Sequence, residues 1–293
     1  MPRALITGTG MLGTALYAAA EDHGYSVQAI SRAQLDLVNA NAVRELILST
    51  RPDLVLHTAA LTRVNYCQQH PQEAQAINAV GTASLVAAAE KVMARVVYFS
   101  TDYVFDGAKR QPYVESDRPA PLNAYGASKR AGEYAPLDYF RGHVVRTSAV
   151  FGPRGNGVAE RNFIRAIFSR LKADDDIISV VANQRTALTF AQHLANMVMA
   201  LLADGLPKLC HLTSAGSNTW FEWAKLVAAE LGLPAQRLRP VTAEEYDATT
   251  PRPAYSVLGS ENPSISTLIS MHPVLPALRA YCQGLLAAGQ MVR

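Results

Sequence analysis

The sequence predicts an α/β protein that contains a doubly wound parallel sheet and a smaller, partly interleaved C-terminal lobe. Short apolar runs that resemble strands alternate with helical patterns through the first half of the chain, and this alternation is typical of βαβ units. A glycine-rich turn joins the first strand to the first helix. With 293 residues, the chain is long enough for about two domains of ordinary size.

The composition excludes several other classes of protein. Charged residues make up only 17% of the chain and hydrophobic residues 49%, so a disordered chain is excluded. The net charge of +3 is too small for a nucleic-acid-binding surface, and no apolar run approaches the ~20 residues of a membrane span. Cys67, Cys210 and Cys282 fit neither a disulfide framework nor a metal site. We expect a cytoplasmic protein with no metal, nucleic-acid partner or membrane partner.

Strands and helices alternate regularly in the first half. The expected strands are residues 4–7, 25–30, 54–57, 96–99 and 144–147. The expected helices run from the glycine-rich turn to about residue 23, around 42–49, over 71–92 and near 125–134. This order predicts a parallel sheet that helices cover on both faces.

The pattern becomes less regular after Phe151. Residues 152–157 predict a loop at which the chain leaves the sheet. Beyond it we expect helices at about 162–171, 190–202, 220–231 and 275–286, strands at 177–181 and 208–212, and a proline-rich stretch at 249–263. We assign residues 1–151, joined by about 176–205, to the sheet domain, and the remainder of 152–293 to a second lobe. Ligands usually bind in a cleft between such lobes.

The turn after the first strand reads Gly8-Thr9-Gly10-Met11-Leu12-Gly13. In this position glycines form a tight turn and let the backbone approach a pyrophosphate at the helix N-terminus. Glycine also serves ordinary turns, but the strand–turn–helix context favours a Rossmann-type domain that binds a dinucleotide.

The end of the second strand indicates which dinucleotide is bound. An acidic residue there would bind the ribose hydroxyls of NAD, but this chain has Ser31 and Arg32. A hydroxyl followed by a guanidinium suits a 2′-phosphate better, which favours NADP(H). The alternative is a solvated surface arginine, so NAD stays open. Asp36, which Leu37 follows, is the first carboxylate beyond the strand, and we expect a contact with adenine there.

A tyrosine and a lysine lie one turn apart at the start of a predicted helix. Tyr125 and Lys129 share one face of it. An ammonium beside a phenol lowers the phenol pKa, and such a phenol exchanges a proton with a carbonyl oxygen at neutral pH. The spacing alone would equally fit an exposed helix face. Thr101, however, follows strand 96–99 at the carboxyl edge of the sheet, where its hydroxyl can bond the same carbonyl.

Several motifs together resemble one enzyme family. The glycine-rich turn, Thr101 and the Tyr125/Lys129 pair are similar to those of extended short-chain dehydrogenases/reductases. The resemblance narrows at residues 100–107, STDYVFDG, and 121–129, PLNAYGASK. With Asn162-Phe163 and residues 252–258, RPAYSVL, these runs resemble the dTDP-4-dehydrorhamnose reductase family over essentially the whole chain.

The resemblance implies an NAD(P)H-dependent reductase of a nucleotide-activated 4-keto-6-deoxyhexose. Tyr125 would donate the proton, Lys129 would anchor the cofactor ribose and modify the tyrosine pKa, and Thr101 would orient the ketone. The residues implied to line the cofactor after the third strand are Ala59, Ala60 and Thr62. A homodimer stays open.

The resemblance also implies contacts with the sugar nucleotide. Asp102 and Ala149 would face the sugar. The remaining candidates are Asn162, Gln184 and Arg252. For Arg252, a surface charge in a proline-rich loop is an equally good interpretation.

The chain departs from the family pattern in several places. Its first glycine spacing is one residue shorter, and Ala149 stands where the family commonly has tryptophan. Asn65 stands where aspartate is frequent. The family's metal-linked dimer contact includes a glutamate near the position of Ala15, so no metal is carried over. Trp220 and Trp223 lie on one predicted helix, and we expect both to pack in the core.

Other functions stay open beside this one. A sugar-nucleotide dehydratase would need a further acid/base pair after the threonine, whereas Asp102 is followed by Tyr103. A 3,5-epimerase that is also a 4-reductase would need a cysteine and a histidine, and no cysteine follows in this segment. A non-catalytic regulatory subunit that binds NADP is less favoured, because Thr101, Tyr125 and Lys129 are all present.

Overall fold

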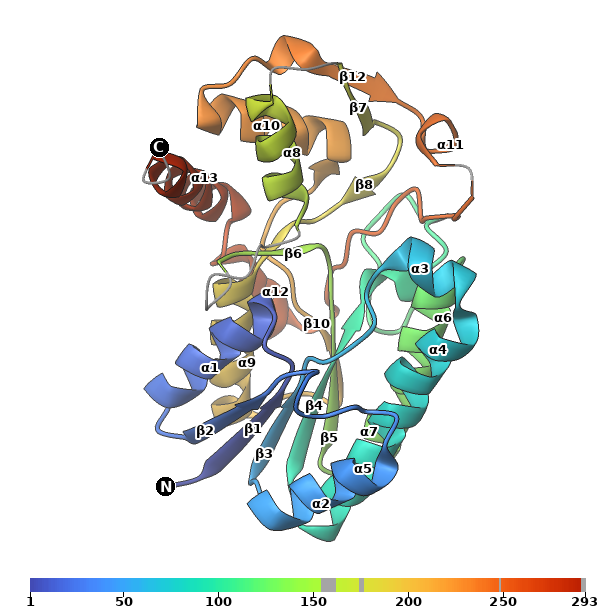
Figure 1. Cartoon of the computed structure of the whole chain (residues 1–293), viewed down its shortest axis with the longest axis vertical. Coiled ribbons are helices and arrows are strands. Elements are labelled where there is room, and N and C mark those ends of the chain that lie inside the picture. Colours follow the sequence, from blue (N-terminus) through green and yellow to red (C-terminus); the bar gives the residue numbers. More distant parts are fainter. Residues whose placement is uncertain (154–161, 174–176, 248, 291–293) are drawn as a thin grey trace.

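A parallel sheet forms the centre of the molecule (Figure 1). The computed structural model describes residues 1–153, 162–173, 177–247 and 249–290. In the described residues the sheet has six strands in the order β10-β5-β4-β3-β1-β2, which are Leu209–His211, Gly142–Thr147, Arg95–Thr101, Leu54–His57, Arg3–Thr7 and Ser26–Ile30. All neighbouring pairs are parallel. The α/β fold expected from the sequence is confirmed.

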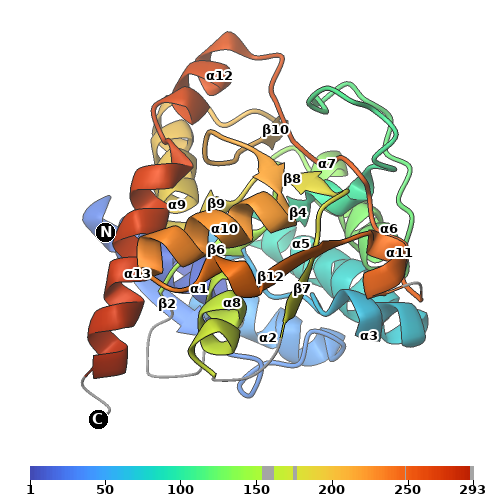
Figure 2. The same ribbon diagram turned by 90° about the horizontal axis from the view of Figure 1, so that it is seen from above.

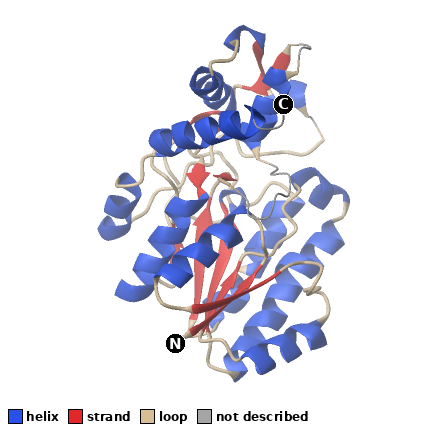
Figure 3. Cartoon of the chain, turned by 60° about the vertical axis from the view of Figure 1, so that its left-hand side comes forward, coloured by secondary structure: helices blue, strands red, loops and turns tan. Residues whose placement is uncertain are grey.

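Helices cover both faces of the sheet, because consecutive strand residues point to opposite sides (Figure 3). Ile6 and Val97 pack in one core with α1 (Met11–Asp22) and α9 (Ala191–Asp204). Leu5 and Val96 pack in the other core with α2 (Ala40–Thr50) and α5 (Thr82–Lys91). The further helices on this second side are α3 (Val64–Gln69), α4 (Pro71–Gln75), α6 (Ala124–Gly132) and α7 (Tyr134–Asp138). A π-helical turn, Ala76–Gly81, joins α4 to α5 within the predicted helix 71–92.

A smaller lobe lies beyond the carboxyl edge of the sheet, and in it α10 lies against α13 (Figure 2). Its core is formed by α8 (Phe163–Lys172), β7 (Ile178–Val181), α10 (Trp220–Leu231), β12 (Leu238–Val241) and α13 (Val274–Gln290). The remaining strands and α-helices are β6 (Val150–Phe151), β8 (Arg185–Thr186), β9 (Thr189–Phe190), β11 (Asn218–Thr219), α11 (Ala243–Tyr246) and α12 (Pro263–Ser270), and two 3-10 turns cover Asp102–Val104 and Ala235–Arg237.

The division between the lobes differs from the expected one. We expected residues 176–205 to join the sheet domain, but β7 pairs with β12 and packs in the smaller lobe. In contrast, α9 packs on α1, and β10 extends the sheet beside β5. The pairing of β7 depends on a partner much later in the chain, which no local pattern reveals. The loop predicted at 152–157 lies outside the described residues from 154 onward.

Two features are absent from the described ranges. No helix there has the length and apolar character needed to cross a lipid bilayer. No cluster of three or more His, Cys, Asp or Glu residues there converges on a possible metal position.

Candidate functional site

A cleft of about 780 Å³ lies at the carboxyl edge of the sheet, where the strand order reverses between β1 and β3. Open α/β sheets bind ligands at such a point. Its lining includes every residue that the sequence analysis connected with the cofactor: Gly8, Gly10, Met11, Leu12, Gly13, Ser31, Arg32, Asp36, Leu37, Ala59, Ala60, Thr62, Tyr125 and Lys129. It also includes residues that the analysis did not assign to the cofactor, among them Phe99, Ser100, Thr147 and Val150.

The glycine-rich turn leaves the N-terminus of α1 open to this cleft. Gly8 has a φ of +101°, and a Cβ there would lie 2.7 Å from Thr58 Oγ1. A Cβ at Gly13 would lie 1.9 Å from the carbonyl oxygen of Gly8, so the helix fits against the turn only with glycine. In the described structure no atom lies within 4 Å of a Cβ built on Gly10, and no side chain caps α1. The first N–H groups of α1 are therefore available to an anion.

Ser31 and Arg32 lie at one end of the cleft, directly after β2. The Ser31 hydroxyl donates to Gln34 Oε1 at 2.8 Å. The Arg32 guanidinium is 78% exposed and lies 3.9 Å from Glu73 Oε1. An exposed pair of this kind contributes little stability, so little energy holds the guanidinium away from a bound phosphate.

Asn78 joins the floor of the cleft to α6, and the sequence analysis did not identify it. Its Oδ1 accepts the Leu61 N–H at 2.7 Å, and its Nδ2 donates to the Leu61 carbonyl at 2.9 Å and to Ser128 Oγ at 3.0 Å. The residue belongs to the π-helical turn and is 1% exposed. In the sequence, Asn78 stands out only as a polar residue within an apolar helical pattern, and that pattern does not reveal its hydrogen-bond partners.

Close packing of α6 against the end of β4 brings Thr101 and Tyr125 together. A Cβ at Gly126 would lie 2.1 Å from the Tyr103 carbonyl oxygen, so glycine is needed for this approach. Asn123 caps α6 by accepting the Gly126 N–H at 2.9 Å. The Thr101 hydroxyl lies near enough to the Tyr125 hydroxyl to act on the pKa of the tyrosine.

Burial controls the protonation of Tyr125 and Lys129. It raises the pKa of Tyr125 well above its ordinary value, although the Thr101 hydroxyl opposes this. Burial also lowers the pKa of Lys129 to about 7, against the attraction of Glu133. Lys129 Nζ lies 4.1 Å from the centre of the Tyr98 ring. The lowering of the Tyr125 pKa by the Lys129 ammonium stays a prediction.

Asp102 is a buried carboxyl group that fixes the direction of the Thr101 hydroxyl. Thr101 Oγ1 donates to Asp102 Oδ1 at 3.1 Å and accepts the Tyr103 N–H at 3.2 Å. Asp102 is 3% exposed, and burial raises its pKa to about 6 against hydrogen bonds from Ser256, Thr101 and Thr186. The carboxyl group is therefore held by hydroxyl groups of the protein.

A buried ion pair supports the sheet side of the site. Glu133 is 0% exposed and accepts hydrogen bonds from Arg146 Nε at 2.8 Å, Arg146 Nη2 at 2.7 Å and Ser100 Oγ at 2.5 Å. These contacts keep the pKa of Glu133 below its ordinary value, although burial opposes them. Arg146 Nη1 lies 3.4 Å from His211 Nε2, which connects the pair to β10.

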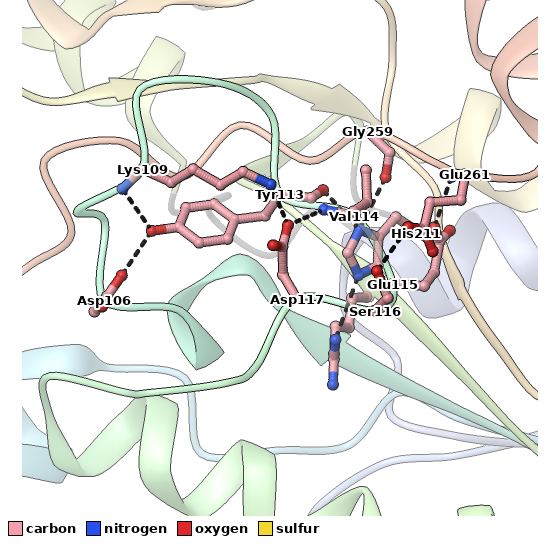
Figure 4. A network of polar contacts seen from close by, with 11 residues as sticks. Asp106, Lys109, Tyr113, Val114, Glu115, Ser116, Asp117, His211, Gly259 and Glu261 are labelled. Atoms are coloured by element: carbon pink, nitrogen blue, oxygen red, sulfur yellow. Dashed lines mark hydrogen bonds and ion pairs between the residues drawn. The ribbon is translucent and has the colours of Figure 1, made fainter.

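A polar network extends from His211 to the loop before α6 and to the segment after Arg252 (Figure 4). Glu115 Oε1 accepts the His211 N–H at 2.9 Å, and Glu115 Oε2 accepts the Glu261 N–H at 3.0 Å. His211 Nδ1 lies 2.9 Å from the Gly259 carbonyl oxygen. These bonds fasten the segment after Arg252 to the edge strand of the sheet.

A second cleft of about 510 Å³ lies in the smaller lobe, and both Gln184 and Arg252 line it. Arg252 Nη2 donates to Asn65 Oδ1 at 2.7 Å. The Arg252 guanidinium opposes the rise of the Tyr103 pKa that burial causes, and the Tyr103 ring centre lies 5.8 Å from that of Tyr125. Tyr103 therefore connects the second cleft with the Tyr125 side chain.

Two aromatic side chains also line the second cleft. The ring centres of Phe163 and Trp220 are 4.7 Å apart. We expected both tryptophans to pack in the core. Trp223 is 1% exposed and does so, but Trp220 is half-buried, because its position on the α10 surface faces the cleft.

Within the described residues, four candidates lie outside both linings: Thr101, Asp102, Ala149 and Asn162. Asn162 caps α8 by accepting the Arg165 N–H at 2.9 Å, and its Nδ2 donates to the Tyr281 hydroxyl at 2.9 Å. Ala149 is half-buried against the core of the smaller lobe. The structure brings Thr101 and Asp102 close to Tyr125, and Asn162 Nδ2 lies 3.5 Å from the sulfur of Met11, which lines the first cleft.

Comparison with known sequences matches almost the whole chain. Residues 2–286 match the family of the RmlD substrate binding domain. A dTDP-4-keto-6-deoxy-D-glucose reductase from Streptomyces niveus is 37% identical over 262 residues, which cover 88% of this chain and 89% of that protein. A dTDP-4-dehydrorhamnose reductase from Streptomyces griseus is 37% identical over 265 residues, which cover 88% of this chain and 85% of that protein.

Solved structures are similar over the same length. The crystal structure of dTDP-4-dehydrorhamnose reductase from Bacillus anthracis in complex with NADP has a TM-score of 0.87 and 33% identity, and the match covers 96% of this chain and 99% of that one. The UDP-glucose 4-epimerase of Thermus thermophilus in complex with NAD has a TM-score of 0.77 at 20% identity, covering 96% and 98%. This second likeness concerns the fold alone.

Proposed function

Because the chain belongs to the dTDP-4-dehydrorhamnose reductase family, we propose that it reduces the C4 ketone of a nucleotide-activated 4-keto-6-deoxyhexose with Tyr125 as the proton donor. It is an NAD(P)H-dependent oxidoreductase and an extended short-chain dehydrogenase/reductase. The observation that supports the residue roles is the proximity of the Thr101 and Tyr125 hydroxyl groups at the end of a dinucleotide-sized cleft that Tyr125 and Lys129 line.

The first cleft fits a dinucleotide. The turn at Gly8 leaves the N–H groups of α1 open for the pyrophosphate. Arg32 offers a guanidinium for a 2′-phosphate at the end of β2, which favours NADPH over NADH. We assign the adenosine to Ser31, Arg32, Asp36 and Leu37, and the nicotinamide half to Ala59, Ala60, Thr62, Tyr125 and Lys129. When bound, NADPH supplies the hydride for C4.

Tyr125 acts as the general acid. Burial raises its pKa, so the phenol keeps its proton until negative charge develops on the C4 oxygen. The O–H bond of Tyr125 then breaks, and the proton forms the new alcohol. The Lys129 side chain offsets the phenolate that remains, and it anchors the ribose. Thr101 exchanges its hydrogen bond to Asp102 for one to the same C4 oxygen.

The second cleft takes the nucleotide part of the substrate. Arg252 and Arg170 supply positive charge for a diphosphate, and Gln184 supplies an amide. Phe163 and Trp220 supply aromatic surface for a base. The remaining proposed contacts, with the sugar or with the nucleotide, are Asp102, Ala149 and Asn162.

The test follows NADPH oxidation by the loss of reduced-nicotinamide absorbance, with dTDP-4-dehydrorhamnose and related 4-keto sugar nucleotides. We expect one alcohol at C4 for each NADPH consumed, identified by NMR, and slower turnover with NADH. Interconversion of sugars without net NADPH consumption would instead indicate an epimerase. Binding of NADPH with no turnover of any sugar would indicate a regulatory subunit.

A homodimer and a cytoplasmic location stay predictions. Sedimentation equilibrium of the full chain tests the first, and fractionation of cells tests the second.

A further inference from the structure

Thr147 has a buried hydroxyl group that the protein does not satisfy. The residue is the last of β5 and is 6% exposed. Of the buried side-chain nitrogen and oxygen atoms in the described residues, only Thr147 Oγ1 has no hydrogen-bond partner. An unpaired buried hydroxyl destabilises a folded protein, and its presence calls for an explanation.

The side chain lies at the end of the first cleft that is remote from Ser31 and Arg32. Thr147 lies opposite Thr101 in the parallel register of β4 and β5, so the two side chains share one face of the sheet. Thr147 lines the cleft, as do Tyr125 and Lys129. The other end of the cleft lies at β2, across β3 and β1 in the strand order.

We propose that the Thr147 hydroxyl binds the carboxamide of the nicotinamide ring and so positions the ring beside Tyr125. This inference rests on the proposed function. A dinucleotide with its phosphates at the α1 N-terminus and its adenosine at β2 extends its other half over β4 and β5. The carboxamide offers both N–H donors and a carbonyl acceptor, and a threonine hydroxyl pairs with either.

The proposal explains an arrangement that is unfavourable in the protein alone. A valine at position 147 would have nearly the same shape and would leave no unpaired hydroxyl. The threonine therefore lowers the stability of the cofactor-free protein and gains its partner when the nicotinamide binds. Stability and cofactor affinity should consequently respond in different directions when the hydroxyl is removed.

The variant Thr147→Val tests this by binding rather than by activity. Dissociation constants are measured by titration calorimetry for NADPH and for 2′-phospho-ADP-ribose, which lacks the nicotinamide ring. We expect NADPH to bind about 3- to 10-fold more weakly, as one neutral hydrogen bond predicts. We expect an unchanged affinity for 2′-phospho-ADP-ribose, and a midpoint of thermal unfolding without ligand that is unchanged or higher.

The matched variant Thr147→Ser keeps the hydroxyl and should keep the wild-type affinity for NADPH. Equal affinity of Thr147→Val and wild type for NADPH would overturn the proposal. So would an equal weakening of both probes, or an unchanged NADPH affinity with a raised KM for the sugar, which would assign the hydroxyl to the substrate. The binding comparison needs no sugar, so it decides the role of Thr147 even where the proposed reduction fails.

Discussion

Replacement of Asn78 by alanine should weaken both the fold and the cofactor cleft. The side chain is 1% exposed and makes hydrogen bonds of 2.7 and 2.9 Å to the N–H and the carbonyl of Leu61. Asn78→Ala leaves both backbone groups without these partners, and each buried unpaired group costs about 1–3 kcal/mol. Because water can enter the space left by the amide, we expect the free energy of unfolding to fall by about 2–4 kcal/mol.

The assay combines urea unfolding without ligand and calorimetric titration with NADPH. Leu61 lies between two proposed cofactor contacts, Ala60 and Thr62, so NADPH should bind at least about threefold more weakly to Asn78→Ala. The matched control is Asn39→Ala, which removes an amide that accepts the Ala42 N–H at 3.1 Å at the exposed start of α2. The control should lose about 1 kcal/mol of stability and no affinity for NADPH.

Two results would refute this reasoning. If Asn78→Ala loses no more stability than Asn39→Ala, the buried amide does not hold Leu61. If stability falls as expected but NADPH binds as tightly as to the wild type, the amide supports the fold and not the cleft.

Four further perturbations test other parts of the site. Tyr125→Phe should lower kcat about 10²-fold or more with nearly unchanged NADPH affinity; an unchanged kcat contradicts the assignment. Arg32→Ala should narrow the preference for NADPH over NADH, measured as the ratio of kcat/KM, by about 1–2 kcal/mol; a wild type that prefers NADH contradicts this. Because Ala149 lacks a large aromatic surface, the wild-type enzyme should favour a 4-keto sugar that is bulkier or differently configured than dTDP-4-dehydrorhamnose. The variant Ala149→Trp should shift the preference, measured as kcat/KM, toward dTDP-4-dehydrorhamnose. The prediction is wrong if the wild type already prefers dTDP-4-dehydrorhamnose and the tryptophan only lowers kcat/KM for it. Folding lowers the pKa of Glu133 from 4.5, so the stability that its carboxylate contributes is present above that pH and is lost as the pH falls. In urea unfolding, the free energy of unfolding of Glu133→Gln should be about 3–5 kcal/mol lower than that of the wild type at pH 7, and the difference should shrink progressively below about pH 4.5. A difference that does not change with pH would count against the ion pair with Arg146.

The positions of the cofactor residues could be predicted from the sequence because they depend on strand ends. In a parallel sheet all carboxyl ends meet at one edge. Once the strands were located in the sequence, Gly8, Ser31 and Ala59 could be predicted to line one cleft, as they do. The helix that starts at Ala124 likewise fixes the spacing of Tyr125 and Lys129 without any knowledge of distant contacts.

The remaining features depend on pairs of residues that are distant in the chain. Thr147 lies opposite Thr101 only because of the register in which β4 and β5 pair. Asn78 reaches Leu61 and Ser128 only because a π-helical turn directs it there. The protonation of Lys129 depends on how deeply α6 is buried, which no local pattern reports.

The route of the chain between the two lobes limits how the protein can be altered. After α8 and β7 in the smaller lobe, the chain returns to build α9 and β10, then leaves again for α10 and β12. Ile265 of α12 packs in the sheet-domain core, and α13 packs in the smaller lobe. No single cut in the chain separates one core from the other, so neither lobe is a transplantable module. A new sugar preference must arise by substitutions within this shared chain, because recombination cannot exchange one lobe as a unit.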